Sequence, residues 1–241
     1  MNTIKCIASG GKGGVGKSTI TILTARASAA LGIRVGVVDL ALGNPTTSLI
    51  FLGEVPRHTL ATYVINASSL GEVVHVVPTE HGPIYLVPSG RGDLALVSSY
   101  GGLVEGFGEI INYLIDRVSV DYVLVDFPAF EPEVDEVFGS ALSICNTVYP
   151  IGTQDPGSLI AVKNLAQFAR RNSLELGRPL LNMFRESLGR QWVSALGKLV
   201  GVEPSVVHYD PWLIRWVNDG GGHYGIGVKE ALTYILKDIL K

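Results

Sequence analysis

A glycine-rich segment with two lysines and two hydroxyl side chains lies near the start of the chain. It reads Gly10-Gly11-Lys12-Gly13-Gly14-Val15-Gly16-Lys17-Ser18-Thr19 and fits the pattern G-x-x-x-x-G-K-[ST] counted from Gly11. Glycines let the backbone wrap a phosphate group so that successive N–H groups point at the anion, and a following helix adds its positive end. The segment predicts a nucleotide-binding loop, in which Lys17 contacts the β and γ phosphates and Ser18 ligates Mg²⁺.

Such a loop must lie between a strand and a helix, and the rest of the chain supplies both. Segments with helical spacing of apolar residues, such as Leu159 to Ala169, separate short runs rich in β-branched residues. Runs that are apolar almost throughout, such as Tyr122 to Val125, are typical of strands buried on both faces. We therefore predict a doubly wound α/β fold, with a mostly parallel sheet and helices on both faces. The predicted strands are Thr3 to Ser9, Arg34 to Asp39, Ile84 to Pro88, Asp121 to Asp126, Asn146 to Ile151, Pro179 to Phe184 and Ser205 to Tyr209.

Length and composition agree with one core. The chain has 241 residues, of which 47% are apolar and 17% charged, and this composition excludes a disordered chain. At about 150 residues per domain the length fits one or two domains, and no linker stands out. We expect a single P-loop nucleotide-binding domain over residues 1–241. The longest uncharged stretch, Val137 to Gln154, contains Gly139 and Pro150 and fits a helix end plus a strand better than a membrane span.

The N-terminus and the cysteines give an expected compartment. The first residues lack the basic start and long apolar centre of a secretory signal, so we expect a cytoplasmic protein. Cys6 and Cys145 each lie in an apolar run and show no Cys-x-x-Cys spacing. We interpret them as buried free thiols with a packing role.

A second lysine in the glycine-rich segment, Lys12, is not required by a plain phosphate-binding loop. The run from Lys12 to Ser18 resembles the deviant Walker A motif of the MinD/ParA family, a group of ATPases similar to the nitrogenase iron protein class. In that family the first lysine reaches across a dimer to the partner's nucleotide. The resemblance implies binding of ATP with Mg²⁺, contacts to the nucleotide from Gly11 through Thr19, and a homodimer that ATP favours through Lys12.

The resemblance extends to later segments. Asp39 ends a predicted strand where the family has a switch I carboxylate near Mg²⁺, and Asp126 lies in a stretch similar to the family's Walker B and switch II region. Together with Lys12 and Lys17 they form the implied catalytic set, and with Ser18 they form the implied metal site. Each carboxylate has a second interpretation as the cap of the following turn.

Two further segments resemble the family's base-binding region. Asn182 ends a strand where the family has an Asn that reads the adenine edge, while Asp210 and Pro211 begin the loop that flanks the base. Asn182 also suits a strand-end turn for its own sake. The glycine-rich stretch from Asp219 to His223 is predicted to be a loop near the base or the dimer edge.

Two positions depart from the family pattern. Ala41 stands where the family has a second switch I Asp that positions the attacking water, and Phe130 stands where MinD-like relatives have a glycine close to the γ phosphate. Phosphoryl transfer depends on positioning and electrostatics, so we predict an ATPase of low turnover that still binds ATP. Glu131 is near enough in sequence to replace the missing carboxylate, but an ordinary surface role is the preferred interpretation.

Charge distribution bears on possible partners. The net charge is −3, yet residues 163–198 carry a local charge of +5. A ParA-like partition or positioning ATPase could bind DNA nonspecifically through these residues, although scattered arginines are more often a solvated helix face. The alternatives are a nucleotide-gated scaffold or adaptor for an unknown protein partner and a MinD-like membrane-associated positioning factor. The candidate DNA contacts are Arg170, Arg171, Arg185, Arg190 and Lys198.

The last predicted helix, Val228 to Leu240, tests the membrane alternative. Its apolar residues form one stripe, while its polar face mixes acidic and basic side chains instead of being strongly basic. We interpret it as a helix that packs on the core, and stable membrane association is not expected.

Overall fold

The computed structural model of the chain describes residues 3–90, 102–219 and 225–241. The predicted loop residues Gly220 to His223 therefore lie outside the described part. Among the described residues no helix combines the length and the apolar character that crossing a bilayer requires.

A nine-stranded sheet forms the centre of the described structure. Its spatial order is β3-β4-β2-β5-β1-β6-β8-β9, with β7 paired to β6, and all pairs are parallel except β3 with β4. The order places β1 between β5 and β6, so the loop that follows β1 lies at the middle of the sheet. The strands are β1 (Thr3–Ala8), β2 (Val35–Asp39), β3 (His75–Val77), β4 (Ile84–Val87), β5 (Tyr122–Asp126), β6 (Thr147–Gly152), β7 (Glu175–Leu176), β8 (Leu180–Phe184) and β9 (Ser205–His208).

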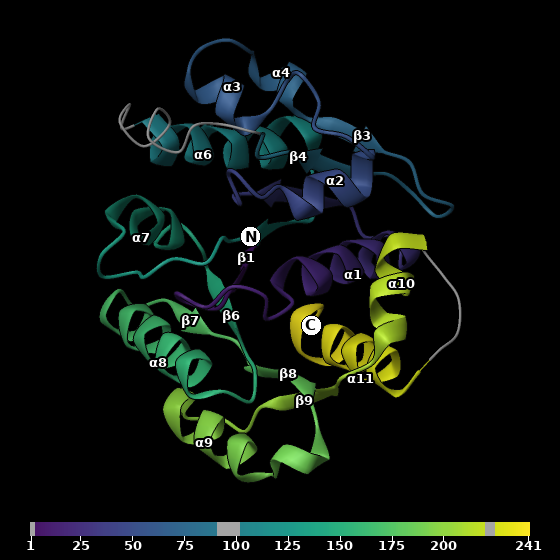
Figure 1. Ribbon diagram of the computed structural model, residues 1–241. Helices are drawn as coiled ribbons and strands as arrows, with labels where there is room; N and C mark the ends of the chain where they lie inside the picture. The colour runs from purple at the N-terminus through teal and green to yellow at the C-terminus, as the bar shows by residue number, and fades with distance from the viewer. Residues whose placement is uncertain (1–2, 91–101, 220–224) are drawn as a thin grey trace.

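Helices cover both faces of this sheet, with α7 and α8 on one side and α1, α10 and α11 on the other (Figure 1). The α-helices are α1 (Lys17–Ala30), α2 (Thr46–Leu52), α3 (Leu60–Val64), α4 (Leu70–Val73), α6 (Gly102–Tyr113), α7 (Glu136–Leu142), α8 (Pro156–Arg171), α9 (Gln191–Val200), α10 (Pro211–Asp219) and α11 (Ile226–Tyr234). Two π-helical turns, η1 (Leu114–Val118) and η3 (Ile235–Ile239), continue α6 and α11, and η2 (Glu186–Leu188) is a 3₁₀ turn.

The side chains of β1 point alternately into two hydrophobic cores, one on each face of the sheet. Cys6 and Ala8 point into the core beneath α6 and α7, whereas Ile7 points into the core beneath α1 and α11. Successive strand residues face opposite sides, so a strand that is apolar on both must be covered twice. The doubly wound arrangement predicted from the sequence is confirmed.

All seven predicted strands are present, and the structure adds two short ones, β3 and β7. The predicted terminal helix is observed as α11 and η3. Its stripe residues Val228, Ala231, Ile235 and Ile239 are buried in the core, so the core-packing interpretation is confirmed. β3 and β7 were missed because three residues and two residues carry too little pattern to indicate a strand.

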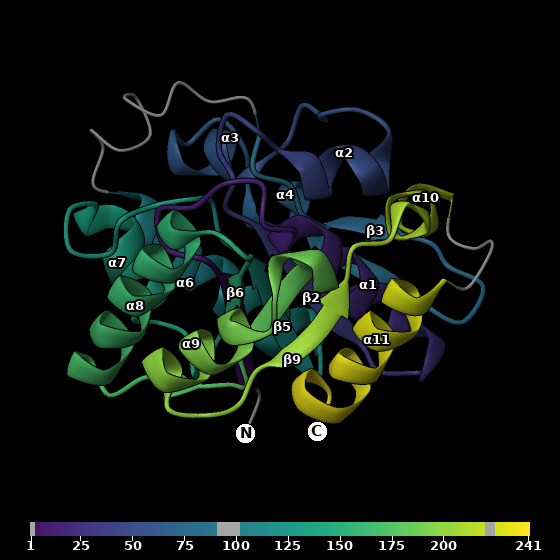
Figure 2. The same cartoon turned by 60° about the horizontal axis from the view of Figure 1, so that its bottom comes forward.

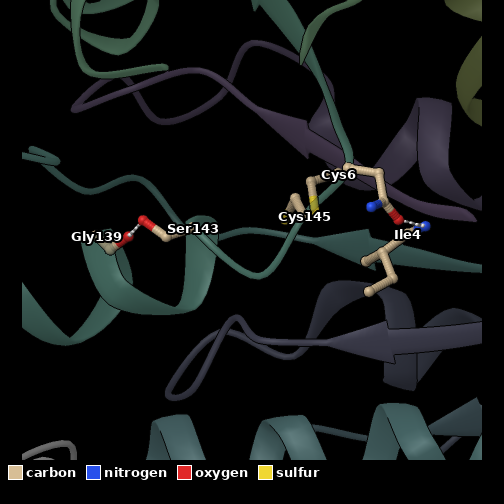
Figure 3. Close-up of a disulfide and its surroundings, with 6 residues drawn as sticks. Ile4, Cys6, Gly139, Ser143 and Cys145 are labelled. Carbon is tan, nitrogen blue, oxygen red and sulfur yellow. Dashed lines mark hydrogen bonds between the residues drawn. A yellow bond between two sulfur atoms is a disulfide. The ribbon is translucent and has the colours of Figure 1, made fainter. Parts of the chain in front are cut away.

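The interpretation of the cysteines as free thiols was wrong. Cys6 of β1 and Cys145, just before β6, form a disulfide with a Cα–Cα distance of 6.1 Å (Figure 3). Beside it, Asn146 Oδ1 accepts a hydrogen bond of 2.7 Å from Ile4 N. The two cysteines are 139 residues apart, so their spacing gave no signal, and only the pairing of β1 with β6 brings them together.

We predict that reduction of this disulfide destabilises the protein. Closing a loop of 139 residues restricts the unfolded chain, and removal of such a bond costs about 2–5 kcal/mol. Denaturant unfolding with and without a reductant measures the difference, and a Cys6→Ala, Cys145→Ala variant should show none. Detection of two reactive thiols in unreduced, denatured protein would contradict the bond.

Candidate functional site

The glycine-rich segment is the connection between β1 and α1, as predicted. Gly10, Gly14 and Gly16 have φ values of +62°, +73° and +95°. At Gly16 a Cβ atom would lie 2.3 Å from Asn182 Nδ2, so both backbone conformation and space require glycine. Gly16 caps α1 without a side-chain hydrogen bond. The first N–H groups of a 14-residue helix are thus left to an anion.

Lys17 lies inside this loop. Only 8% of the residue is exposed, and its Nζ donates hydrogen bonds to Ser9 Oγ at 3.0 Å and to the Lys12 carbonyl at 3.5 Å. Burial lowers the pKa of Lys17, and the nearby charge of Asp126 opposes that shift. The ammonium group is therefore held at the phosphate cradle by partners that an anion could replace.

Two carboxylates are buried side by side at the carboxyl ends of neighbouring strands. Asp39 of β2 pairs in register with Asp126 of β5, and both side chains are inaccessible to solvent. Asp39 Oδ1 accepts a hydrogen bond from Ala41 N at 2.9 Å. Its Oδ2 accepts from Ser48 N at 3.0 Å and from Ser48 Oγ at 2.7 Å. Both oxygens of Asp39 are thus satisfied.

Asp126 is less completely satisfied. Its Oδ2 accepts a hydrogen bond of 2.7 Å from Thr47 Oγ1, but its Oδ1 is buried and has no hydrogen-bond partner among the described residues. Burial and, next to it, the negative charge of Asp39 raise the pKa of Asp126 to about 7. The hydrogen bond from Thr47 and the nearby Ser18 hydroxyl oppose this rise. A buried carboxylate pair with one unpartnered oxygen beside a serine hydroxyl suits a hard divalent cation such as Mg²⁺.

Thr47 and Ser48 are functional candidates that sequence reasoning missed. They lie in the first turn of α2 and bind Asp126 and Asp39, so this helix is fastened to both carboxylates. The run Thr46-Thr47-Ser48 shortly after a strand-end Asp was the available signal, because clustered hydroxyls often satisfy buried acids.

The two departures from the family pattern have different structural outcomes. Ala41 places only a methyl group after Asp39, and its carbonyl accepts from Ser89 Oγ at 3.4 Å. The bulk that Phe130 brings in place of a glycine is directed away from the loop. Its ring is buried against Phe127 and Phe138, at centroid distances of 5.4 and 5.7 Å. Only its N–H faces the loop, donating to the Gly10 carbonyl at 3.1 Å.

Glu131 is more closely placed than a solvated surface residue. A Cβ atom on Gly11 would lie 2.1 Å from Glu131 Oε1, so the carboxylate packs directly on the loop backbone. Asn164 Nδ2 of α8 donates to its Oε2 at 3.3 Å. A second carboxylate lies on the same side, where Asp155 Oδ1 forms a 3.2 Å ion pair with Lys12 Nζ. Asp155 also caps α8 by accepting from Ser158 N at 2.9 Å.

Of the three predicted base-binding residues, Asn182 contacts the loop, whereas Asp210 and Pro211 lie at the start of α10. Asn182 is buried, its Nδ2 donates to the Val15 carbonyl at 2.8 Å, and its Oδ1 has no partner among the described residues. Asp210 accepts hydrogen bonds from Trp212 N at 2.9 Å and Gly227 N at 3.1 Å, which joins the starts of α10 and α11. Pro211 is the first residue of α10. Asn182 therefore keeps a free acceptor, whereas both oxygens of Asp210 have a structural use.

Most of the candidate DNA contacts are engaged within the chain. Arg170 Nη2 donates to the Val200 carbonyl at 2.7 Å, and Arg171 pairs with Glu133 at 2.6 Å. Arg190 pairs with Glu186 at 2.9 Å, and the Arg185 guanidinium lies 4.5 Å from the centre of the Tyr209 ring. A phosphate backbone would have to compete with these partners.

Comparisons with known proteins agree with this geometry. Antiactivator FleN from Pseudomonas aeruginosa is 34% identical over 126 residues, which cover 50% of this chain and 43% of FleN, so the match spans less than half of that relative. The septum site-determining protein MinD from Pyrococcus horikoshii, solved with Mg-ADP, superposes with a TM-score of 0.79 at 20% identity, covering 98% of this chain and 95% of that one. The cell division ATPase MinD from Pyrococcus furiosus gives 0.78 at 22% identity, covering 98% of both chains.

The structural likenesses show the fold, because their sequence identities are low. The decisive match is to a family model described as the CobQ/CobB/MinD/ParA nucleotide binding domain, which aligns with residues 6–220 and so includes the loop, both buried carboxylates and Asn182. The chain belongs to this MinD/ParA nucleotide-binding family.

Proposed function

We propose that the chain is a Mg²⁺-dependent ATPase of low turnover that dimerises when it binds ATP, and that it works as a single P-loop domain. The observation that carries the proposal is the unpartnered, buried Oδ1 of Asp126, a carboxylate that lies close to Ser18 and Lys17 of the glycine-rich segment. The P. horikoshii MinD structure, which contains Mg-ADP, supports the same pairing of ligand and fold.

Different parts of the site bind the phosphates, the metal and the base. The N–H groups from Gly11 to Thr19 and the Lys17 ammonium bind the phosphates, while Ser18 and Asp126 hold Mg²⁺, with Asp39 fixing α2 beside it. When bound, Mg²⁺ neutralises charge on the phosphate oxygens. The Oδ1 of Asn182 accepts a hydrogen bond from the exocyclic amine of adenine, which guanine cannot offer at that edge; this favours ATP over GTP. Pro211 flanks the base.

Slow hydrolysis follows from Ala41. Its methyl group neither accepts a proton nor orients water, and both oxygens of Asp39 are occupied by Ala41 N and Ser48. Binding requires only the cradle, Lys17 and the metal, so binding outlasts catalysis. In the dimer, Lys12 leaves Asp155 for the partner's nucleotide; its side chain is 42% exposed and therefore accessible to a second subunit.

The cellular role we propose is intracellular positioning or partition in the cytoplasm, through a protein partner. Relatives described as septum site-determining and as a putative plasmid partition protein support this class. A nucleotide-gated adaptor with scarcely any turnover is the second candidate, and Ala41 is the observation that favours it. DNA binding through the five basic residues stays a prediction, weakened by the intrachain partners of Arg170, Arg171, Arg185 and Arg190.

Calorimetry and light scattering test the proposal directly. With Mg²⁺ present we expect ATP to bind more tightly than GTP and to convert a monomer into a dimer. Lys17→Ala should abolish binding because it removes the buried ammonium, whereas Lys12→Ala should keep binding and lose the dimer. No heat of association with either nucleotide would overturn the function, and a dimer retained in Lys12→Ala would overturn the role of Lys12.

Restoring a carboxylate at switch I should raise the turnover number. We expect Ala41→Asp to increase steady-state phosphate release by roughly 10²-fold, because a carboxylate then orients the attacking water. Ala41→Asn is the matched control of similar size, and it should give little increase. Equal rates for wild type and Ala41→Asp would mean that Phe130 or another defect limits turnover. A wild-type rate like that of ordinary family members, abolished by Lys17→Ala, would contradict the impaired site.

The raised pKa of Asp126 predicts pH-dependent metal binding. Since a proton and Mg²⁺ compete for the carboxylate, Mg²⁺-ATP affinity should fall as pH drops from 8 to 6, by up to about tenfold per unit below the pKa of about 7. Asp126→Asn should bind more weakly and show a shallower slope. ATP itself titrates equally in both titrations, so the difference between the slopes reports Asp126. Identical slopes would contradict the assignment.

A further inference from the structure

The last strand of the sheet, β9, has one edge turned away from its neighbour. Ser205 N donates to the Pro179 carbonyl and Tyr209 N to the Phe184 carbonyl, both at 2.9 Å, so these amides point toward β8. Amides alternate in direction along a strand, and those of Val206 and His208 therefore point away from β8. β9 ends the strand order, so no strand of the described residues lies on that side.

An acidic side chain already mimics a neighbouring strand at one of these positions. His208 N donates to Glu230 Oε2 of α11 at 2.7 Å, and the ring Nδ1 of His208 lies 2.8 Å from Oε1. The carboxylate occupies the place where the carbonyl of a further strand would accept. Proteins protect open edges with such charged groups, and here the protection stops at His208.

Val206, two residues before His208 on the same free edge, lines two cavities that we together call the trench. Figure 2 shows β9 lying between α9 and α11, and the structure has a cavity on each side of the strand. The larger, about 890 Å³, lies against α9 and includes Val193, Lys198 and Val202. The smaller, about 350 Å³, lies against α11 and includes Lys237. Both are lined by Val206 and Glu230, so together they follow the free edge of β9.

The cavities and the charges of this trench indicate what kind of chain could bind there. One outward-facing amide with a cavity on each side of the strand matches a single extended chain, which offers main-chain carbonyls at the edge and side chains to either side. Phe184, Val193 and Val202 give the wider part an apolar wall. Among the charged side chains that line the two cavities, three lysines have no ion-pair partner within 4.0 Å in the described residues, against one such acid, Glu203. The three are Lys198, Lys237 and Lys241.

We propose that the trench along β9 binds an extended segment of a partner protein as an additional strand. Main-chain hydrogen bonds to Val206 anchor the segment, apolar side chains at alternate positions fill the cavity beside α9, and acidic residues meet the three lysines. Strand addition of this kind obtains affinity from the backbone and specificity from pockets for every second side chain. The inference does not depend on nucleotide binding.

A displayed library of random twelve-residue peptides, selected on the wild-type protein, tests the proposal. Enriched sequences should alternate apolar with polar residues and carry net negative charge. Val206→Pro removes the outward amide without removing a bond to β8, and should weaken the selected peptides at least tenfold. Val206→Thr keeps the amide and should stay within about threefold of wild type. Unchanged unfolding midpoints show that both variants fold.

A second measurement holds if Val206→Pro fails to fold. Peptide binding should slow hydrogen exchange at the Val206 amide and leave that of Val207, which already faces β8, unchanged. Lys198→Glu combined with Lys237→Glu should weaken the acidic peptides at least tenfold. Selected peptides that bind Val206→Pro as tightly as wild type, a library that gives no enrichment over an unrelated protein, or self-association that Val206→Pro abolishes would each overturn the proposal.

Discussion

The pairing of Asp39 with Asp126 is the constraint on which the site depends. Two carboxylates buried in register at adjacent strand ends repel each other and lose hydration, an arrangement that persists only with compensating partners. Asp39 has its partners in Ala41 N and Ser48, and Asp126 has Thr47 on one oxygen only. The oxygen without a partner, Oδ1 of Asp126, makes the site suitable for a cation.

The same pairing fixes the local structure around it. α2 starts where it does because Thr47 and Ser48 hold the acids, and the strand ends align because β1, β2 and β5 are neighbours in the sheet. The phosphate cradle follows β1, so anion-binding amides and cation-binding oxygens meet at one edge of the sheet. A nucleotide with its bound metal offers phosphates to the amides and a cation to the carboxylate oxygens, whereas the nucleotide or the metal alone offers only one of these.

Much of this was predictable from the sequence, because strand runs such as Tyr122 to Asp126 and the loop from Gly11 to Ser18 are local patterns. What could not be predicted depends on contacts between distant residues. The bond between Cys6 and Cys145 needs the adjacency of β1 and β6, and the burial of Phe130 needs the pocket formed by Phe127 and Phe138. Arg171 looked available in the sequence, but it pairs with Glu133, which lies 38 residues away. The pair of Arg190 with Glu186 has i,i+4 spacing, so that one could have been predicted.

One strand connects the nucleotide site with the trench at the sheet edge. Within β8, Asn182 binds the Val15 carbonyl of the loop, and Phe184, two residues later, pairs with His208 and lines the cavity beside α9. Met183 between them has a φ of +55°, and the register between β8 and β9 shifts across this segment. The strand whose Asn182 binds the loop therefore also supplies, two residues later, part of the wall of the cavity beside α9.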